Sequence, residues 1–244
     1  MTKPAPVVNA LSFDIEDWFH MVEIDAVADP ERWPALPTLV ERYTRRILDI
    51  LAAYDARATF FVLGWVAERY PGIVPAIVRG GHEVATHGYG HHKVYEMQPD
   101  EFREDMRRSI ELLGAQSGTR VRGFRATSFS ITPGAEWAFD VLHDLGIEYD
   151  ASLFPAARGH GGYPCPARPH ASTIAPSGRP LPELPMSVMR LGPLRLPFSG
   201  GGYLRALPQA LIRAGFEQLN RDGRPAVVYL HPRDFAPDCP RVPM

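Results

Sequence analysis

The chain has 244 residues, of which 45% are hydrophobic and 22% charged, and its formal net charge is −2. This length and composition fit one large α/β domain and exclude a disordered or fibrous chain. The near-neutral charge, with no basic run, gives no electrostatic reason to expect nucleic acid or an anionic membrane surface as a partner.

The two cysteines and the N-terminal residues bear on the compartment. Cys165 and Cys239 make neither a disulfide framework nor a zinc motif, so we expect free thiols in a reducing compartment. Residues 1–6 lack the apolar segment of a signal peptide. No window has the roughly 18 apolar residues of a membrane span. We therefore expect a soluble, cytoplasmic protein with no integral membrane segment.

Apolar runs and amphipathic segments alternate along the chain. We expect strands over residues 7–13, 58–64, 83–87, 121–124, 147–150 and 226–230. We expect helices over residues 36–54, 65–80 with a break at Pro71, 100–113, 134–145 and 208–219. For the first helix, Thr38 is the predicted N-cap, with Glu41 completing a capping box. This alternation predicts an α/β fold with a parallel sheet and right-handed crossovers.

The pattern fails between about residues 154 and 198, where proline and glycine are frequent. We expect a long ordered excursion over the surface there, with a few short strands. Irregular segments of this length inside a domain often form a lid or a wall of a binding site. The chain as a whole, residues 1–244, is predicted to be a single catalytic domain.

Chargeable side chains follow the apolar runs at the points where the predicted strands end. They are Asp14, His87, Arg125, Asp150 and His231. In an open sheet or a barrel of parallel strands, chemistry collects at the carboxyl ends of the strands. We therefore expect these five side chains to meet at one catalytic mouth.

Two histidines with four-residue spacing, His87 and His91, are candidates for metal binding. Gly88 and Gly90 between them favour a loop over a regular helix. Two imidazoles and one carboxylate are a familiar ligand set for Zn²⁺ with a position open to water. With His92 next to them, however, the histidines could also belong to a polar surface loop.

The first predicted strand supplies three acids: Asp14, Glu16 and Asp17. On an extended strand Asp14 and Glu16 point to one side, whereas a turn after Ile15 would let Asp17 swing inward. One carboxylate would bind the metal, and another would stay unligated as a base. The alternative is that these acids cap a following turn.

Five segments together resemble the polysaccharide deacetylases of the NodB-homology type, carbohydrate esterase family four. The resemblance covers nearly the whole chain and is closest to the branch associated with exosortase exopolysaccharide clusters. The segments are SFDIEDWFH at residues 12–20, THGYGH at 86–91, GFRATSFS at 123–130, YDASLFP at 149–155 and YLHP at 229–232.

The resemblance implies a distorted, NodB-like (β/α) barrel with fewer than eight parallel strands. It also implies hydrolysis of the N-acetyl group of an amino sugar, with His87 and His91 as metal ligands and Asp14 as the base. The family's third ligand directly follows the base, where this chain has Ile15, so Glu16 or Asp17 must replace it. The expected cofactor is a divalent ion, above all Zn²⁺, with Co²⁺, Ni²⁺ or Mn²⁺ as alternatives.

The remaining roles also come from the resemblance. His231 would protonate the leaving amine, Arg125 would pair with Asp14, and Asp150 would support the His231 imidazolium. A plain surface pair of Arg125 and Asp14 is the alternative. Thr127 stands where the family usually has proline. The aromatic side chains of Phe129 and Trp18 are candidates either for stacking on a sugar ring or for the core.

The leading hypothesis is a metal-dependent N-deacetylase acting on an exopolysaccharide or on its lipid-linked precursor; the absence of a signal peptide favours the precursor. One rival is a C–N hydrolase of a small cyclic amide or ureide on the same scaffold. The other is an inactive carbohydrate-binding homologue, although every residue that the chemistry requires has a candidate.

Overall fold

The computed structural model describes residues 6–21, 24, 27, 29–156, 159 and 161–240. Within these ranges the centre is an eight-stranded sheet in the order β10-β1-β2-β3-β4-β5-β7-β6. Its parallel strands are β1 (Ala10–Ile15), β2 (Thr59–Val62), β3 (Glu83–Thr86), β4 (Gly123–Phe124), β5 (Tyr149–Asp150), β7 (Leu181–Glu183) and β10 (Val227–Leu230). The last strand, β6 (His170–Ser172), runs antiparallel to β7.

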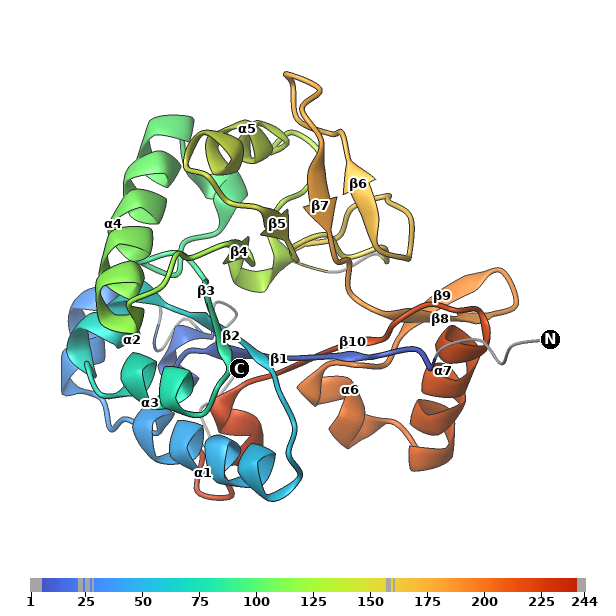
Figure 1. The fold of residues 1–244 in the computed structure, drawn as a ribbon, viewed down its shortest axis with the longest axis horizontal. Coiled ribbons are helices and arrows are strands. Elements are labelled where there is room, and N and C mark those ends of the chain that lie inside the picture. The colour runs from blue at the N-terminus through green and yellow to red at the C-terminus, as the bar shows by residue number, and fades with distance from the viewer. Residues whose placement is uncertain are drawn as a thin grey trace.

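The sheet curls around its own inner face without closing into a full barrel (Figure 1). The predicted α/β fold, a distorted barrel with fewer than eight parallel strands, is confirmed for the described residues. The crossover helices lie on the outer face: α1 (Val40–Ala53), α2 (Gly64–Arg69), α3 (Ile73–Arg79), α4 (Pro99–Ser117) and α5 (Trp137–Asp144). The largest hydrophobic cluster lies between these helices and the sheet.

The alternation of side chains along β1 decides which of them face the interior of the curl. Phe13 and Ile15 are 2% and 0% exposed and belong to the cluster beneath the helices. Because neighbouring side chains on a strand point to opposite faces, Ser12 and Asp14 face the inside. The strand therefore delivers one carboxylate to the carboxyl edge of the inner face.

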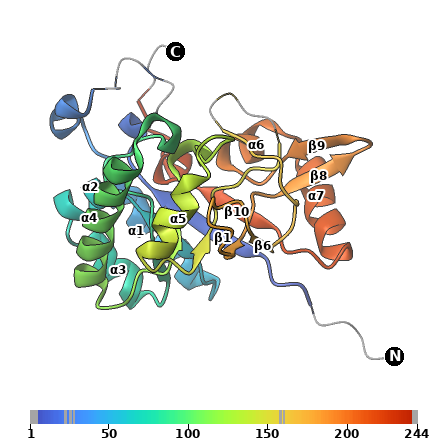
Figure 2. The same ribbon diagram turned by 90° about the horizontal axis from the view of Figure 1, so that it is seen from above.

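The proline-rich excursion contains β6, β7 and a hairpin of β8 (Val188–Leu191) and β9 (Leu194–Pro197). After it come α6 (Gly201–Ala206), which the sequence did not predict, and α7 (Gln209–Arg221). Figure 2 shows the hairpin and α7 together at the end of the molecule away from α2 and α4. The expectation of a few short strands in this excursion is confirmed.

The predicted N-terminal cap of α1 is wrong. The helix begins at Val40 with Leu39 as its N-cap residue, and Leu39 makes no side-chain cap hydrogen bond. The hydroxyl of Thr38 instead donates to Asp17 Oδ2 at 2.5 Å. The Asp17 carboxylate also accepts from the backbone N–H groups of Leu39 and Val40, so an acid from another segment caps this helix.

Two further expectations concern thiols and membranes. Cys165 and Cys239 are both free, the first buried and the second half-buried. None of the helices in the described ranges has the length and apolar character that crossing a bilayer requires.

Candidate metal and catalytic site

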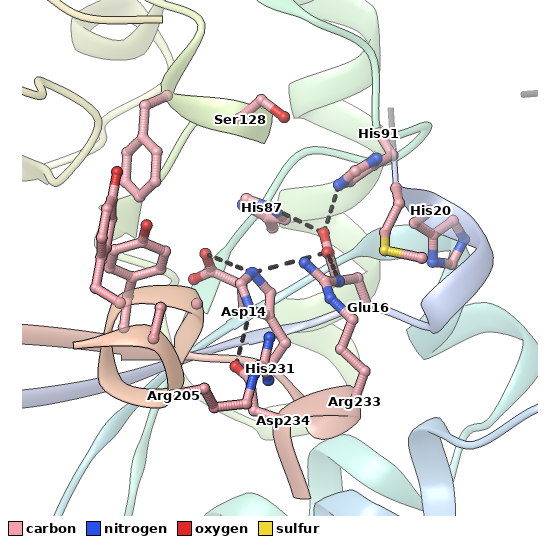
Figure 3. A pocket seen from close by; sticks show the side chains of 16 residues that line it. Asp14, Glu16, His20, His87, His91, Ser128, Arg205, His231, Arg233 and Asp234 are labelled. Carbon is pink, nitrogen blue, oxygen red and sulfur yellow. Dashed lines mark hydrogen bonds and ion pairs between the residues drawn. The ribbon is translucent and has the colours of Figure 1, made fainter. Parts of the chain in front are cut away.

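A cavity of about 470 Å³ opens at the carboxyl edge of the sheet (Figure 3). Its wall includes Asp14 and Glu16 from the first strand, His87 and His91 after β3, and His231 after β10. The sequence predicted that strand-end side chains would meet at one mouth. Asp14, His87 and His231 do so, whereas Arg125 and Asp150 do not line this cavity.

Three side chains in this cavity are close enough to hold one cation. Single ligand atoms of Glu16, His87 and His91 all lie within 4.8 Å of one another, and all three residues are buried. The Nε2 atoms of His91 and His87 lie 2.5 Å and 3.5 Å from Glu16 Oε2. Two imidazoles and a carboxylate suit Zn²⁺ and related divalent ions, so this donor set fits the metal that the family resemblance implies.

The ring of His87 is oriented by its other nitrogen. Nδ1 lies 2.8 Å from the carbonyl oxygen of Arg125, which can accept only, so Nδ1 carries the proton. In the neutral ring Nε2 is then the unprotonated nitrogen, and it faces Glu16. A backbone carbonyl behind a histidine is a common way to fix the tautomer of a metal ligand.

The loop that carries His91 is held by Asp105. Asp105 on α4 accepts from the backbone N–H groups of Tyr89 and Gly90 at 2.7 and 2.8 Å. Gly88 has φ +79°, a backbone conformation that residues other than glycine rarely adopt. His91 itself has φ +58° and is 8% exposed, whereas His92 is exposed. His91 is therefore part of a built site and not of a polar surface loop.

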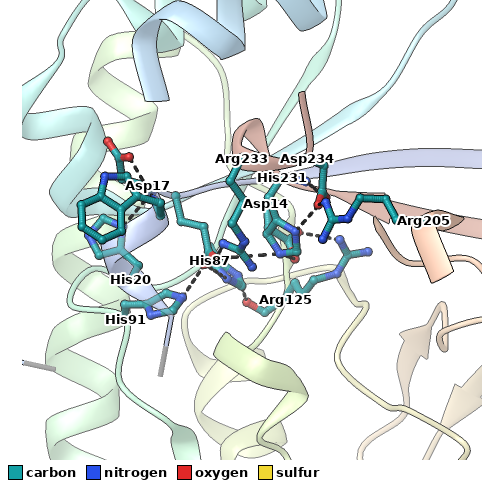
Figure 4. Close-up of polar contacts among 12 residues, drawn as sticks. Asp14, Asp17, His20, His87, His91, Arg125, Arg205, His231, Arg233 and Asp234 are labelled. Carbon is teal, nitrogen blue, oxygen red and sulfur yellow. Dashed lines mark hydrogen bonds and ion pairs between the residues drawn. The ribbon is translucent and has the colours of Figure 1, made fainter. Parts of the chain in front are cut away.

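Glu16 and Asp17, between which the sequence could not choose, point to different places. Glu16 lies with the two histidines (Figure 3). Asp17 lies beside His20 (Figure 4) and caps η1 (Trp18–His20) and the N-terminus of α1. The prediction that Asp17 might bind the metal is therefore wrong. The alternative, that an acid of this segment caps a following turn, describes Asp17.

Asp14 is clamped by Arg125 inside the protein. Arg125 Nη1 donates to Asp14 Oδ1 at 2.6 Å and to Ser12 Oγ at 2.9 Å, and the guanidinium lies 4.1 Å from the centroid of Phe61. Arg125 and Asp14 are 1% and 3% exposed. A plain surface pair is thus excluded, and Asp14 presents its other oxygen, Oδ2, toward His231 at 3.8 Å.

His231 has a different carboxylate partner from the predicted one. Its Nδ1 lies 3.3 Å from Asp234 Oδ2, and its backbone N–H donates to the same oxygen at 2.9 Å. The oxygens of Asp150 accept from the backbone N–H and hydroxyl of Ser152 instead. The prediction that Asp150 supports His231 is wrong, because the Asp150 carboxylate is bonded to Ser152, two residues along its own segment, and Asp234 is on the same turn as the histidine.

The cavity residues to which the sequence analysis gave no role include His20, Arg233 and Asp234. Arg233 Nη1 pairs with Glu16 Oε1, and Asp234 also pairs with Arg205. Arg233 and Asp234 directly follow the last motif, which ends at Pro232. Two charged residues next to that motif were therefore a sequence signal that could have identified them. The His20 ring accepts the Asp17 N–H through Nδ1 at 2.8 Å, and its Nε2 has no hydrogen-bond partner.

Both aromatic candidates are 4% exposed and belong to hydrophobic clusters. Trp18 is 4% exposed, packs in a cluster with Phe19 and Trp33, and donates its Nε1–H to the Pro37 carbonyl. Phe129 lines the cavity. It follows Thr127 in η5 (Thr127–Phe129), where Phe129 has φ +56°.

The charges around the cavity tune its carboxylates. Burial alone would raise the pKa of Glu16, but contacts with His91 and Arg233 more than offset this and hold that pKa well below its ordinary value. Burial likewise would raise the pKa of Asp234, and its hydrogen bond with His231 lowers it overall. Burial lowers the pKa of His91. An ionised carboxylate with a neutral imidazole is the state that metal binding requires.

Comparison with known protein families gives two matches along the chain. A family model described as polysaccharide deacetylase matches residues 30–149, and one described as a domain of unknown function (DUF3473) matches residues 151–244. A peptidoglycan-N-acetylglucosamine deacetylase of Bacillus cereus is 37% identical over 76 residues, which are 31% of this chain and 28% of that relative. The matched segment is thus less than a third of the relative's length.

Two solved structures share the fold over most of the chain. A putative polysaccharide deacetylase from Mycobacterium smegmatis has a TM-score of 0.64 at 23% identity, covering 95% of this chain and 79% of the other. The allantoinase PuuE has a TM-score of 0.64 at 19% identity, covering 94% and 79%. At these identities the likeness concerns the fold alone. The family model is what places residues 30–149 of this chain in the polysaccharide deacetylase family with NodB homology, and the fold agrees with that placement.

Proposed function

We propose that the protein is a metal-dependent hydrolase that removes N-acetyl groups from amino sugars of an exopolysaccharide or of its lipid-linked precursor. One observation carries the proposal. A buried Glu16–His87–His91 cluster and the Asp14–His231 pair share the wall of one open cavity. The first can hold a cation, and the second can move protons beside it.

A divalent cation held by the cluster would polarise the acetyl carbonyl and make water a better nucleophile near neutral pH. Asp14 Oδ2 is the free oxygen of a carboxylate whose other oxygen is held by Arg125, so it can accept the proton of the attacking water. Arg125 keeps that carboxylate in one orientation. Because Asp14 is buried, its geometry is fixed before the substrate arrives.

His231 is placed to complete the reaction. Asp234 accepts from Nδ1–H, which leaves Nε2 directed to the space beside Asp14 and Glu16, at 3.8 Å from a carboxylate oxygen of each. Protonated at Nε2, the ring can donate to the departing amine nitrogen, and the carbon–nitrogen bond then breaks to give amine and acetate. Asp234 stabilises the imidazolium during this transfer.

The aromatic lining of the cavity is suited to a sugar. Phe129, Tyr203 and Tyr229 line the cavity, and the ring centroids of Phe129 and Tyr229 are 4.9 Å apart. Aromatic faces pack against the apolar face of a sugar ring, while phenolic hydroxyls can bond its hydroxyl groups. This lining supports an N-acetylated carbohydrate as the substrate class.

We further infer that both matched regions work as one catalytic domain. His87, His91 and Arg125 lie in the first region and His231 and Arg233 in the second. The segment that carries Asp14 precedes both. The cytoplasmic location expected from the N-terminal residues stays a prediction.

The test is metal analysis of the purified protein combined with acetate release from N-acetylglucosamine oligomers. We expect one divalent ion per chain, loss of acetate release after chelation, and recovery on adding Zn²⁺, Co²⁺, Ni²⁺ or Mn²⁺. A protein that binds metal but releases no acetate from any N-acetylated glycan would contradict the proposal. Allantoin in the same assay tests the rival C–N hydrolase, and glycan binding without turnover would indicate an inactive homologue.

A further inference from the structure

The two oxygens of Glu16 have different surroundings. The difference comes from Arg233, a residue to which the sequence motifs assign no role. Oε2 faces the Nε2 atoms of both histidines at 2.5 and 3.5 Å. Oε1 is paired with Arg233 Nη1 and lies 3.8 Å from His231 Nε2. One oxygen therefore faces the candidate metal position, and the other faces a permanent cation.

Arg233 is held in place by the same turn that holds His231. It lies in η6 (Pro232–Phe235), where the Asp234 carboxylate accepts the His231 backbone N–H and closes a capping box. The side chain of Arg233 is 19% exposed and that of Glu16 is 4% exposed. An ion pair this far from solvent is weakly screened, so its geometry persists in the folded protein.

A carboxylate can bind a cation through one oxygen or through both. A divalent ion that moved toward Oε1 of Glu16 would approach the guanidinium of Arg233, which bears a like charge and already occupies that oxygen. The repulsion between the two cations leaves Oε2 as the favourable ligand atom. Lysine would supply the same charge at this place, but not the planar guanidinium.

Resting on the proposed function, we propose that Arg233 is a positioning residue that restricts Glu16 to one-oxygen metal binding. A cation held by Oε2 and two imidazoles keeps coordination positions open to water and to the acetyl carbonyl. With both oxygens bound, Glu16 would fill one of those positions. Arg233 thus acts on the reaction through Glu16, and it does so without touching the reacting atoms.

The experiment uses the full chain loaded with Co²⁺ alone, because the visible absorption of Co²⁺ is stronger at low coordination number than at high. We expect intense absorption for the unchanged protein and a several-fold weaker band for Arg233→Met, with Co²⁺ still bound one to one. Arg233→Lys should retain most of the intensity. Arg103→Met, which removes an exposed ion pair with Asp144 on the outer helices, should leave the spectrum unchanged.

Three results would overturn the inference. One is an Arg233→Met spectrum equal to that of the unchanged protein; another is loss of Co²⁺ binding by a folded Arg233→Met protein. The third, weak absorption by the unchanged protein itself, needs no variant and decides the matter even if Arg233→Met fails to fold. Failure of the unchanged protein to bind Co²⁺ would instead contradict the proposed function, so the two failures are distinguishable.

Discussion

Two pairs of buried carboxyl groups lie at this sheet, and they differ in what stands beside them. Asp14 and Glu16, both 3% exposed, are each paired with an arginine, Arg125 and Arg233. Asp150 and Glu183, at 0% and 1%, lie opposite each other on β5 and β7. Their hydrogen bonds come from neutral donors, such as the backbone N–H of Leu153 to Glu183.

The difference appears in how each pair is charged. Burial raises the pKa of Asp150, and burial together with the Asp150 charge raises the pKa of Glu183 well above its ordinary value. The pKa of Glu16 instead lies well below its ordinary value, because cationic partners outweigh burial. Burial without a cation raises the pKa of a carboxyl group, and a cation beside it lowers that pKa. We therefore expect the proposed chemistry at the first pair.

The largest expected effect comes from neutralising one acid of each pair. Asp14→Asn removes the proposed proton acceptor and should lower the rate of acetate release by about 10²–10⁴-fold while metal remains bound. The matched variant Asp150→Asn should change the rate far less, because Asp150 does not line the cavity. Rates and metal content of both proteins check this; full activity of Asp14→Asn would remove the base assignment.

Breaking the Arg125–Asp14 pair should cost more stability than breaking an exposed pair. Arg125→Met leaves Asp14 buried with an uncompensated charge, and we expect a loss of about 3–5 kcal/mol in the free energy of unfolding. Arg103→Met, whose ion pair with Asp144 is exposed, should cost about 0–1 kcal/mol. Denaturant unfolding measures both. Equal losses would mean that burial does not set the strength of the Arg125–Asp14 pair.

A variant of Asp17 tests whether this residue caps α1 or binds the metal. Asp17→Ala removes the acceptor for the first N–H groups of α1 and should destabilise the protein by about 0.5–2 kcal/mol. Because Asp17 points away from the histidines, the variant should keep its metal, whereas Glu16→Gln should bind metal much more weakly. Metal content after dialysis measures the contrast, and the opposite pattern would make Asp17 the ligand.

The second carboxyl pair should make stability depend on pH. A raised folded pKa means that Glu183 stabilises the protein fully below the ordinary pKa of glutamic acid, about 4.3, and that this contribution is lost as pH rises through the folded value. Glu183→Gln removes the titrating group. The stability of this variant should therefore fall less between weakly acidic and alkaline pH than that of the unchanged protein. Thermal melts across that range test this, with the exposed Glu217→Gln as the control. Identical slopes for Glu183→Gln and the unchanged protein would contradict the raised pKa.

The sheet could be predicted from the chain because its signals are local. Continuous apolar runs such as residues 58–63 indicate strands covered on both faces, and the break at Pro71 separates α2 from α3 as expected. The same reasoning placed Asp14, His87, Arg125 and His231 at strand ends. It failed for α6, a short helix that no amphipathic pattern marks.

The sequence by itself determined which side chains are brought to the carboxyl edge of the sheet. The order of apolar and polar residues predicts where each strand ends, and so which residue stands at that end. Only the tertiary structure decided their partners. Asp17 turned to the start of α1, Asp234 took the place expected of Asp150, and Arg233 paired with Glu16 from the end of the adjacent strand. Beyond the end of a strand, alternation no longer governs where a side chain points. The direction is then set by whichever donor or charge the folded chain places nearby, and for Asp17 and Glu16 these partners include residues from a distant part of the sequence.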